Sequence, residues 1–210
     1  MALSPSQLLT GYARGVFPMA ESADDPELFW VDPPRRGILP IGGVHASRSL
    51  CRDLRRGGWS AHLDCDFDAI VAACADRDVT WINARLAALY AQLHRSGRAA
   101  AIEIRQNGIF AGGLFGVTLG AAFFGESMMS ARPNGSKMAL LWMGDHLARC
   151  GFRLFDTQFL TPHLASMGAI EIPRARYHRM LYDAIAAPAR LDAVPLRSAD
   201  QLWHEITQTS

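Results

Sequence analysis

The stretch FFGESMMS at residues 123–130 is the most informative part of the sequence, because it places one carboxylate, Glu126, inside a largely apolar segment that is typical of a strand. A second stretch of this kind, FDTQF at residues 155–159, carries Asp156 and Gln158. Side chains alternate between the two faces of a strand, so Asp156 and Gln158 are expected to point the same way. Because a buried charge is costly unless it is paired, we expect the two strands to converge on one polar site.

Two interpretations of these acids remain open from the pattern alone. Glu126 or Asp156 could be a buried structural acid that pairs with one of the arginines of the chain. Alternatively, the two acids and the amide could bind or deprotonate an amine, since buried acids with perturbed environments often do chemistry. The spacing does not choose between the two interpretations.

The sequence around these strands predicts an α+β domain. Asn107 and Gly108 indicate a hairpin turn, since this dipeptide tolerates positive φ, and a helix capped by Ser136 and ended by Gly151 precedes the last strand. The predicted strands cover residues 101–105, 109–117, 121–129 and 152–159. Strand meander, helix, strand and helix is the order of an acetyltransferase-like (GNAT-like) domain, which we assign to residues 64–210.

Residues 1–63 predict a small N-terminal α/β lobe, because Pro, Gly and Arg interrupt regular structure repeatedly. One helix is expected at residues 4–12, followed by short strands. Helices at 66–75 and 84–95 then open the second domain, because their apolar residues recur at helical spacing. Asn83 is expected to cap the second of these helices.

Composition describes an ordinary globular chain of 210 residues with a formal net charge of +1. No apolar run approaches the roughly 18 residues that span a bilayer, and the start of the chain lacks a signal sequence, so we expect a cytoplasmic protein without a membrane segment. The four cysteines are scattered and have no histidine at ligand spacing, so no metal is expected. The charge balance neither requires nor excludes a nucleic acid, because a local basic patch is sufficient.

Several blocks of sequence, in one order along the chain, resemble the leucyl/phenylalanyl-tRNA–protein transferase family. They are GVFPM (15–19), WVDPPRRGILP (30–40), HASRSL (45–50), TWI (80–82), GGLFG (112–116), GESM (125–128), SKMALL (136–141) and DTQ (156–158). The resemblance covers residues 4–177 and implies a bacterial aminoacyltransferase with a GNAT-like C-terminal domain.

Such an enzyme moves Leu or Phe, with Met as a further candidate, from aminoacyl-tRNA to the N-terminal Arg or Lys of an acceptor protein. The product is marked for degradation by the N-end rule. The implied partners are therefore Leu-tRNA, Phe-tRNA and proteins with an N-terminal Arg or Lys. Because the donor ester is already activated, the reaction needs positioning of the amine and no cofactor. We expect a monomer.

The resemblance also implies catalytic residues. Asp156 and Gln158 match a pair proposed either to draw a proton from the acceptor amine or to position the substrates. We favour positioning for Gln158, because an amide is a poor base, with Asp156 orienting it and stabilising positive charge. Glu126 matches an acid near the aminoacyl site, where it would hold the ammonium of the substrate or shape the carbonyl site.

Other positions match the aminoacyl pocket and the tRNA site of the family. Trp81 matches an aromatic that stacks on the terminal adenosine, a contact worth roughly 1–3 kcal/mol, although it could also be a partly buried tryptophan at a helix start. Met19 stands where many members have a second adenosine-binding aromatic. The aminoacyl pocket would be lined by Leu114, Phe123, Met128 and Leu140, which the pattern alone makes core residues. Contacts with tRNA phosphates are expected from Arg35, Arg36 and Arg48.

Two other classes of function fit parts of the sequence. The alternative is an acyl-CoA N-acetyltransferase of the same fold, but its glycine-rich pyrophosphate loop is matched poorly, because Lys137 occupies the last small position of the stretch 132–137. A non-catalytic tRNA-binding module would keep Trp81 and the arginines. It would not need Glu126, Asp156 and Gln158 together.

Overall fold

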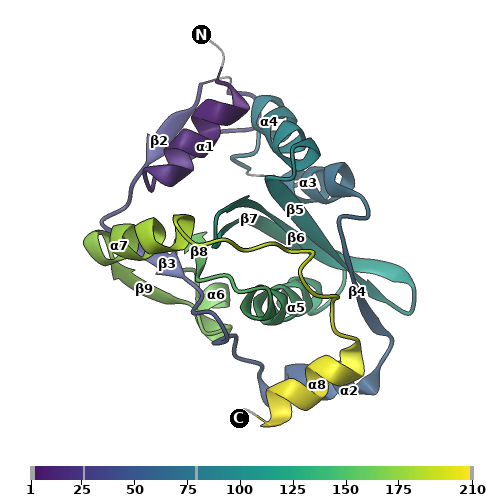
Figure 1. Cartoon of the computed structure of the whole chain (residues 1–210). Coiled ribbons are helices and arrows are strands. Elements are labelled where there is room, and N and C mark those ends of the chain that lie inside the picture. Colours follow the sequence, from purple (N-terminus) through teal and green to yellow (C-terminus); the bar gives the residue numbers. More distant parts are fainter. Residues whose placement is uncertain (1–2, 26, 79, 209–210) are drawn as a thin grey trace.

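The computed structural model describes residues 3–25, 27–78 and 80–208 as a mixed α+β structure around one seven-stranded sheet (Figure 1). The strand order is β4-β5-β6-β7-β8-β3-β9. The pair β7–β8 is parallel, and the other neighbours are antiparallel. The strands are β3 (Arg35–Ile38), β4 (Trp59–Leu63), β5 (Ala99–Gln106), β6 (Ile109–Leu119), β7 (Ala122–Ser130), β8 (Leu154–Gln158) and β9 (Ile170–Pro173). The predicted α+β class is confirmed.

Helices cover both faces of this sheet and enclose two hydrophobic cores. Figure 1 shows α3 (Phe67–Ala75) and α4 (Ala84–Arg95) on one side of the strands and α5 (Gly135–Arg149) on the other. Phe124 of β7 belongs to the first core and Phe123 to the second, as the alternation of side chains along a strand requires. The remaining helices are α1 (Pro5–Ala13) and α7 (Arg174–Ile185) with the first core, and α2 (Arg48–Arg56), α6 (Pro162–Ser166) and α8 (Ala199–Gln208) with the second.

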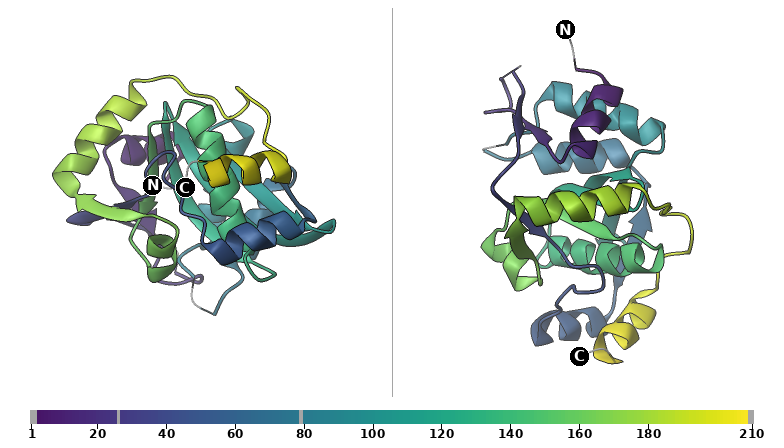
Figure 2. Two further views of the ribbon diagram at one scale, coloured as in Figure 1. Left: turned by 90° about the horizontal axis from the view of Figure 1, so that it is seen from below. Right: turned by 60° about the vertical axis from the view of Figure 1, so that its left-hand side comes forward.

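The N-terminal segment contributes to this sheet as well as to a small sheet of its own. The strands β1 (Phe17–Met19) and β2 (Phe29–Val31) pair only with each other in the described part of the chain. By contrast, β3 and β4, which fall within the expected lobe of residues 1–63, lie in the seven-stranded sheet. The two views of Figure 2 place α2 beside α8, at the end of the molecule opposite α1 and α4. A domain boundary at residue 63 stays a prediction.

Several local predictions are confirmed by hydrogen bonds. The helix expected at residues 4–12 forms as α1, and Ser4 and Gln7 make a reciprocal capping box at its start. The side chain of Asn83 accepts a hydrogen bond of 2.8 Å from the backbone N–H of Leu86 and caps α4. Asn107 turns the hairpin with a φ of 53°.

Two local predictions were wrong. Helix α5 begins at Gly135, one residue before the predicted cap Ser136, whose backbone N–H instead donates to the hydroxyl of Ser130 at 2.8 Å. Helix α2 forms in a region predicted to be irregular. Its core face consists of Leu50 and Leu54, which are four residues apart, so the helical pattern that the sequence carries there is only two residues long.

Among the described residues, no helix is long and apolar enough to cross a membrane.

Candidate active site

Glu126 of β7 is buried, with 6% of its surface exposed, and its carboxylate accepts three hydrogen bonds. The hydroxyl of Tyr12 on α1 donates to Oε1 at 2.7 Å, and the hydroxyl of Tyr90 on α4 donates to Oε2 at 2.8 Å. The side-chain amide of Gln158 donates to the same Oε2 at 3.1 Å. The acid is therefore held by donors from three different elements.

Burial dominates the titration of this acid. Removal from water raises the pKa of Glu126 to about 7, although the hydrogen bonds from Tyr12, Tyr90 and Gln158 oppose the shift. Burial also raises the pKa of Tyr12 and of Tyr90 well above the ordinary value, so both phenols stay neutral donors. Glu126 can consequently change its charge near neutral pH.

This raised pKa predicts a specific dependence of stability on pH. Because the folded state binds the proton more tightly than the unfolded state, the free energy of unfolding should fall as pH rises from about 4.5 to about 7. The loss should reach at most about 3 kcal/mol. Denaturant unfolding of the wild type and of Glu126→Gln, followed by tryptophan fluorescence between pH 5 and 8, measures the effect. The difference between the two proteins cancels all other titrating groups, and a difference that is constant with pH would contradict the assignment.

Asp156 of β8 is fully buried and is paired with an arginine. Arg36 of β3 donates from Nε to Oδ1 at 2.9 Å and from Nη2 to Oδ2 at 2.6 Å. The hydroxyl of Tyr177 on α7 donates to Oδ2 at 2.8 Å. The guanidinium lies between the rings of Phe17 and Tyr177, 4.5 and 4.4 Å from their centroids. Asp156 is therefore a buried acid paired with an arginine, as the first of the two interpretations of the sequence expected.

Gln158 connects the two acids. Its backbone N–H donates to Oδ1 of Asp156 at 2.8 Å, while its side chain reaches Glu126. Its φ of 63° lies in the left-handed region, which is unusual for a residue other than glycine and often marks a functional site. Glu126, Asp156 and Gln158 thus lie together as expected, while their roles in catalysis stay predictions.

The four residues predicted to line an aminoacyl pocket lie in the second core. Leu114, Phe123 and Leu140 are at most 3% exposed, and the half-buried Met128 packs against the same cluster. Met128 lies directly opposite Leu114 in the β6–β7 pair. Of the four, Met128 also lines a cavity of about 500 Å³ whose walls include Arg77.

The two predicted adenosine-binding residues, Trp81 and Met19, both pack against the first core. Trp81 is half-buried just before α4, with its ring edge-on to Tyr90 at 6.4 Å. Because Tyr90 donates to Glu126, Trp81 is separated from the acid by a single side chain. Met19 is half-buried on β1, opposite Phe29 of β2.

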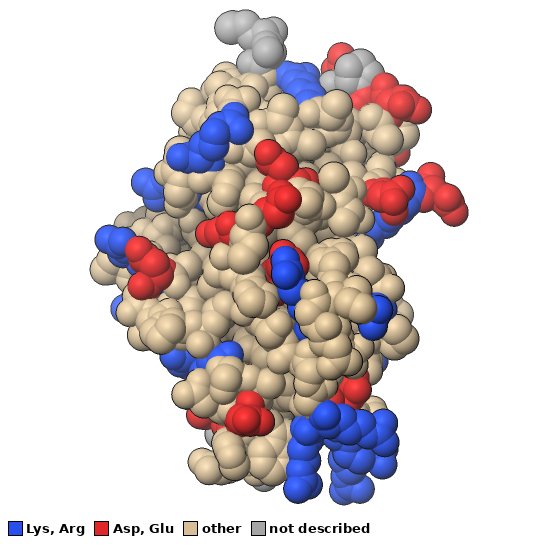
Figure 3. All heavy atoms as spheres, turned by 90° about the vertical axis from the view of Figure 1, so that its right-hand side faces the viewer, with Lys and Arg blue, Asp and Glu red and all other residues tan. Residues whose placement is uncertain are grey.

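The three arginines predicted to contact phosphates have different surroundings. Arg48 is exposed at the first residue of α2, and Arg35 is exposed and pairs with Glu171 at 3.0 Å. Arg36 is 1% exposed and its guanidinium is occupied by Asp156, so a phosphate contact does not fit this residue. Helix α2 adds three further arginines, namely Arg52, Arg55 and Arg56. Figure 3 shows basic side chains gathered at the end of the molecule where α2 and α8 lie.

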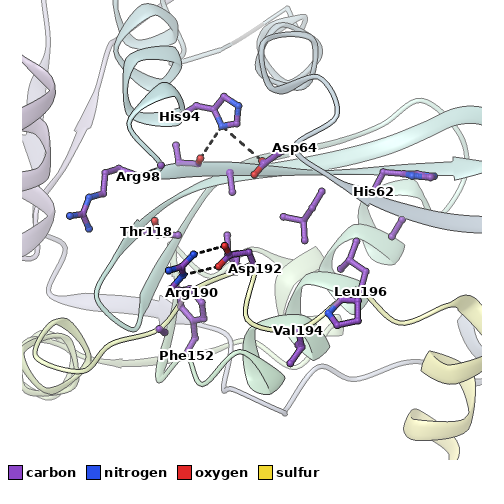
Figure 4. A pocket seen from close by; sticks show the side chains of 18 of the residues that line it. His62, Asp64, His94, Arg98, Thr118, Phe152, Arg190, Asp192, Val194 and Leu196 are labelled. Atoms are coloured by element: carbon purple, nitrogen blue, oxygen red, sulfur yellow. Dashed lines mark hydrogen bonds and ion pairs between the residues drawn. The ribbon is translucent and has the colours of Figure 1, made fainter.

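A cavity of about 1090 Å³ lies apart from this cluster (Figure 4). Its walls come from β4, β5 and the irregular segment 188–196, and none of the predicted site residues lines it. Its walls contain two contacts between a basic and an acidic side chain. Nη2 of Arg190 lies 2.6 Å from Oδ2 of Asp192, and Nδ1 of His94 lies 3.9 Å from Oδ1 of Asp64. In the described part of the chain, no three His, Cys, Asp or Glu side chains are grouped so that they could hold a metal.

Sequence reasoning missed the three tyrosines that hold the two acids. Tyr12 and Tyr90 occupy core positions of α1 and α4, and at helical spacing they count simply as apolar residues. A usable signal was nevertheless present, because a buried tyrosine hydroxyl needs a partner. Three of the four tyrosines of the chain, Tyr12, Tyr90 and Tyr177, donate to a carboxylate of this site.

Comparison with known proteins finds matches over nearly the whole chain. Residues 38–182 match the family model described as leucyl/phenylalanyl-tRNA protein transferase, and residues 1–34 match the model of its N-terminal domain. A leucyl/phenylalanyl-tRNA–protein transferase of Paracoccus denitrificans is 56% identical, over 99% of this chain and 98% of the relative. One from Ruegeria pomeroyi is 53% identical over the full length of both.

A solved structure gives only a weak likeness. It is the C-terminal domain of a putative lysylphosphatidylglycerol synthetase from Agrobacterium fabrum, which is 13% identical with a TM-score of 0.42. The match covers 96% of this chain and 62% of the solved chain.

Proposed function

This chain belongs to the leucyl/phenylalanyl-tRNA protein transferase family, and we propose that the cluster around Glu126 is the place where it transfers the amino acid. The chain is an aminoacyltransferase that moves Leu or Phe from aminoacyl-tRNA to the N-terminal Arg or Lys of an acceptor protein, which creates an N-end-rule degradation signal. Met is a further candidate donor. The observation that carries the proposal is the buried carboxylate of Glu126, joined to Asp156 through Gln158.

The proposed reaction needs only the ester and the amine. The acceptor nitrogen forms a bond to the ester carbonyl carbon, the bond from that carbon to the tRNA ribose oxygen breaks, and the proton lost by nitrogen ends on this oxygen. The amine attacks in its neutral form. Ionised Glu126 stabilises the positive charge that develops on the nitrogen as the new bond forms, and Gln158 positions the carbonyl and the amine. An acid whose pKa is near 7 suits this role, because it can exist as the anion at the pH of a bacterial cell.

The donor would lie against the second core. We assign the side chain of the transferred Leu or Phe to a site lined by Leu114, Phe123, Met128 and Leu140. Three of these side chains are buried in this structure, and Met128 also lines the cavity beside Arg77. Unbranched and aromatic side chains can adapt to both substrates. Exposed Arg48 and Arg35 are proposed to contact phosphates of the tRNA, with the other arginines of α2 beside Arg48.

We propose that Trp81 stacks on the terminal adenosine of the tRNA, with Met19 as a softer second contact. Replacing Trp81 by alanine should then raise the KM for Leu-tRNA about tenfold, because a stacked base is worth roughly 1–3 kcal/mol. The KM for the acceptor protein should change little. Trp81→Phe, which keeps a ring to stack, should recover most of the loss. Steady-state kinetics with each substrate varied in turn tests this, and an unchanged KM for Leu-tRNA in Trp81→Ala would assign Trp81 to the core.

The finer classification of the fold is also a proposal. The parallel pair β7–β8, joined by α5 on one face, gives the order of meander, helix and strand expected of a GNAT-like domain. We further propose a cytoplasmic monomer, because aminoacyl-tRNA is a cytoplasmic substrate.

One assay tests the transfer itself. Purified protein is incubated with radiolabelled Leu-tRNA or Phe-tRNA and a protein that begins with Arg. A matched protein that begins with Asp, and labelled acetyl-CoA in place of the tRNA, serve as controls. We expect label on the Arg protein alone. Label on the Asp protein would change the acceptor class, and acetylation would favour the acyl-CoA alternative.

A further inference from the structure

Arg36 and Tyr177 act on the proposed transfer site through Asp156, and we call these two residues the Asp156 clamp. We propose that the clamp is a positioning device: it makes Asp156 a fixed acceptor that orients Gln158 against Glu126, and it prevents Asp156 from taking a proton from the substrate. This inference rests on the proposed function and assigns positioning roles to Arg36 and Tyr177 within the same site.

The first argument is the complete occupation of the Asp156 carboxylate. Oδ1 accepts from Nε of Arg36 at 2.9 Å and from the backbone N–H of Gln158 at 2.8 Å. Oδ2 accepts from Nη2 of Arg36 at 2.6 Å and from the hydroxyl of Tyr177 at 2.8 Å. A carboxylate has about four acceptor positions, and the residue has no exposed surface. No position is left for a substrate amine.

The second argument is the backbone of Gln158. A left-handed conformation is disfavoured for a residue with a Cβ atom, so it persists only where surrounding contacts impose it. The hydrogen bond from the Gln158 N–H to Asp156 is such a contact, and Asp156 is itself fixed by Arg36. The conformation directs the Gln158 side chain to Glu126. A displacement of Asp156 would therefore move the amide that faces the proposed reacting groups.

The third argument is that the clamp also supports the other acid. Nη1 of Arg36 donates to the carbonyl of Gly15 at 2.9 Å, immediately after α1. Helix α1 carries Tyr12, which donates to Glu126. One buried guanidinium thus connects the supports of Glu126 and of Gln158, and it also packs against the rings of Phe17 and Tyr177.

The test is a double-mutant cycle between Arg36→Lys and Gln158→Ala. Lysine keeps the charge but lacks the planar fork that makes the paired contacts. We expect Arg36→Lys to lower kcat by about 10- to 100-fold, with the KM for Leu-tRNA within about twofold of the wild type. In the Gln158→Ala background the same change should lower kcat by a factor at least about threefold smaller than in the wild type, because the amide that the clamp positions is absent and only the support of Glu126 through α1 remains. A purely stabilising arginine would lower kcat by the same factor in both backgrounds, and that result would overturn the inference.

A matched control and a second variant complete the experiment. Arg197 pairs with Asp145 at 3.1 Å in a partly buried site near α8, so Arg197→Lys should lower the melting temperature and leave kcat unchanged. Tyr177→Phe removes only the hydroxyl. It should lower kcat about 3- to 10-fold in the wild type and hardly at all in Gln158→Ala. If Arg36→Lys does not fold, the Tyr177→Phe variant provides the test. A kcat of Tyr177→Phe equal to that of the wild type would overturn the inference. If the wild-type protein transfers no amino acid from Leu-tRNA or Phe-tRNA, that result overturns the proposed function and leaves the inference about Arg36 without a reaction to act on.

Discussion

Replacing Glu126 by glutamine is expected to lower kcat/KM for transfer by about 100-fold or more, with the fold intact. The amide has nearly the same shape: its oxygen can accept a hydrogen bond from one tyrosine, and its NH2 group can donate to the hydroxyl oxygen of the other. It cannot stabilise positive charge on the attacking amine. In a buried site this electrostatic contribution is large. Initial rates should be measured at pH 8, where a carboxylate with a pKa of about 7 is ionised. Circular dichroism reports whether the variant is folded.

A second buried glutamate provides the control. Glu103 on β5 is 7% exposed and pairs with Arg105, so it resembles Glu126 in residue type and burial but lies outside the cluster. Glu103→Gln should transfer at nearly the wild-type rate. Equal activity of Glu126→Gln and Glu103→Gln would remove Glu126 from the assigned site.

Replacing Asp156 by asparagine is expected to damage both stability and transfer. The change leaves the guanidinium of Arg36 buried and without its negative partner, which costs about 3–5 kcal/mol when a buried pair is broken. The backbone of Gln158 also loses a charged acceptor, so transfer should fall by about 100-fold in the fraction that remains folded. Urea unfolding gives the first quantity, and rates corrected for the folded fraction at low temperature give the second.

Asp145→Asn is the matched control for this prediction. Like Asp156, Asp145 is paired with arginine, in its case Arg149 and Arg197, but it lies on α5 and outside the cluster of Glu126, Asp156 and Gln158. We expect a smaller loss of stability and unchanged transfer. An Asp156→Asn variant that is as stable and as active as the wild type would contradict the contacts assigned to Asp156.

The parts of the fold that could be predicted are those in which local signals agree. The meander with Asn107 at its turn, helix α4 with its Asn83 cap and the polar strands β7 and β8 all combine periodicity with a capping or turn residue. Helix α2 could not be predicted, because only two of its residues face the core. The position of β3 between β8 and β9 could not be predicted either. A strand of four residues carries no local signal for partners that lie more than 100 residues away in the sequence.

For the site, the acids could be found from the sequence and their partners could not. Glu126 and Asp156 are conspicuous because charge in an apolar strand requires compensation. The compensating groups look ordinary: Tyr12 is one apolar position of a helix, and Arg36 lies in a run of prolines and arginines that predicts a surface. Only the three-dimensional arrangement distinguishes Arg36, whose guanidinium is buried, from its exposed neighbour Arg35.

The wide spacing of these partners along the chain has a consequence for synthesis on the ribosome. Arg36 and Asp156 are separated by 120 positions, and Tyr177 follows later still. A nascent chain therefore exposes Arg36 long before its carboxylate partner has been translated, and Glu126 likewise emerges after both of its tyrosine donors. The site can be assembled only when α7 has left the exit tunnel. A copy of the chain that ends before α7 therefore lacks the Tyr177 donor to Asp156 and cannot complete the site.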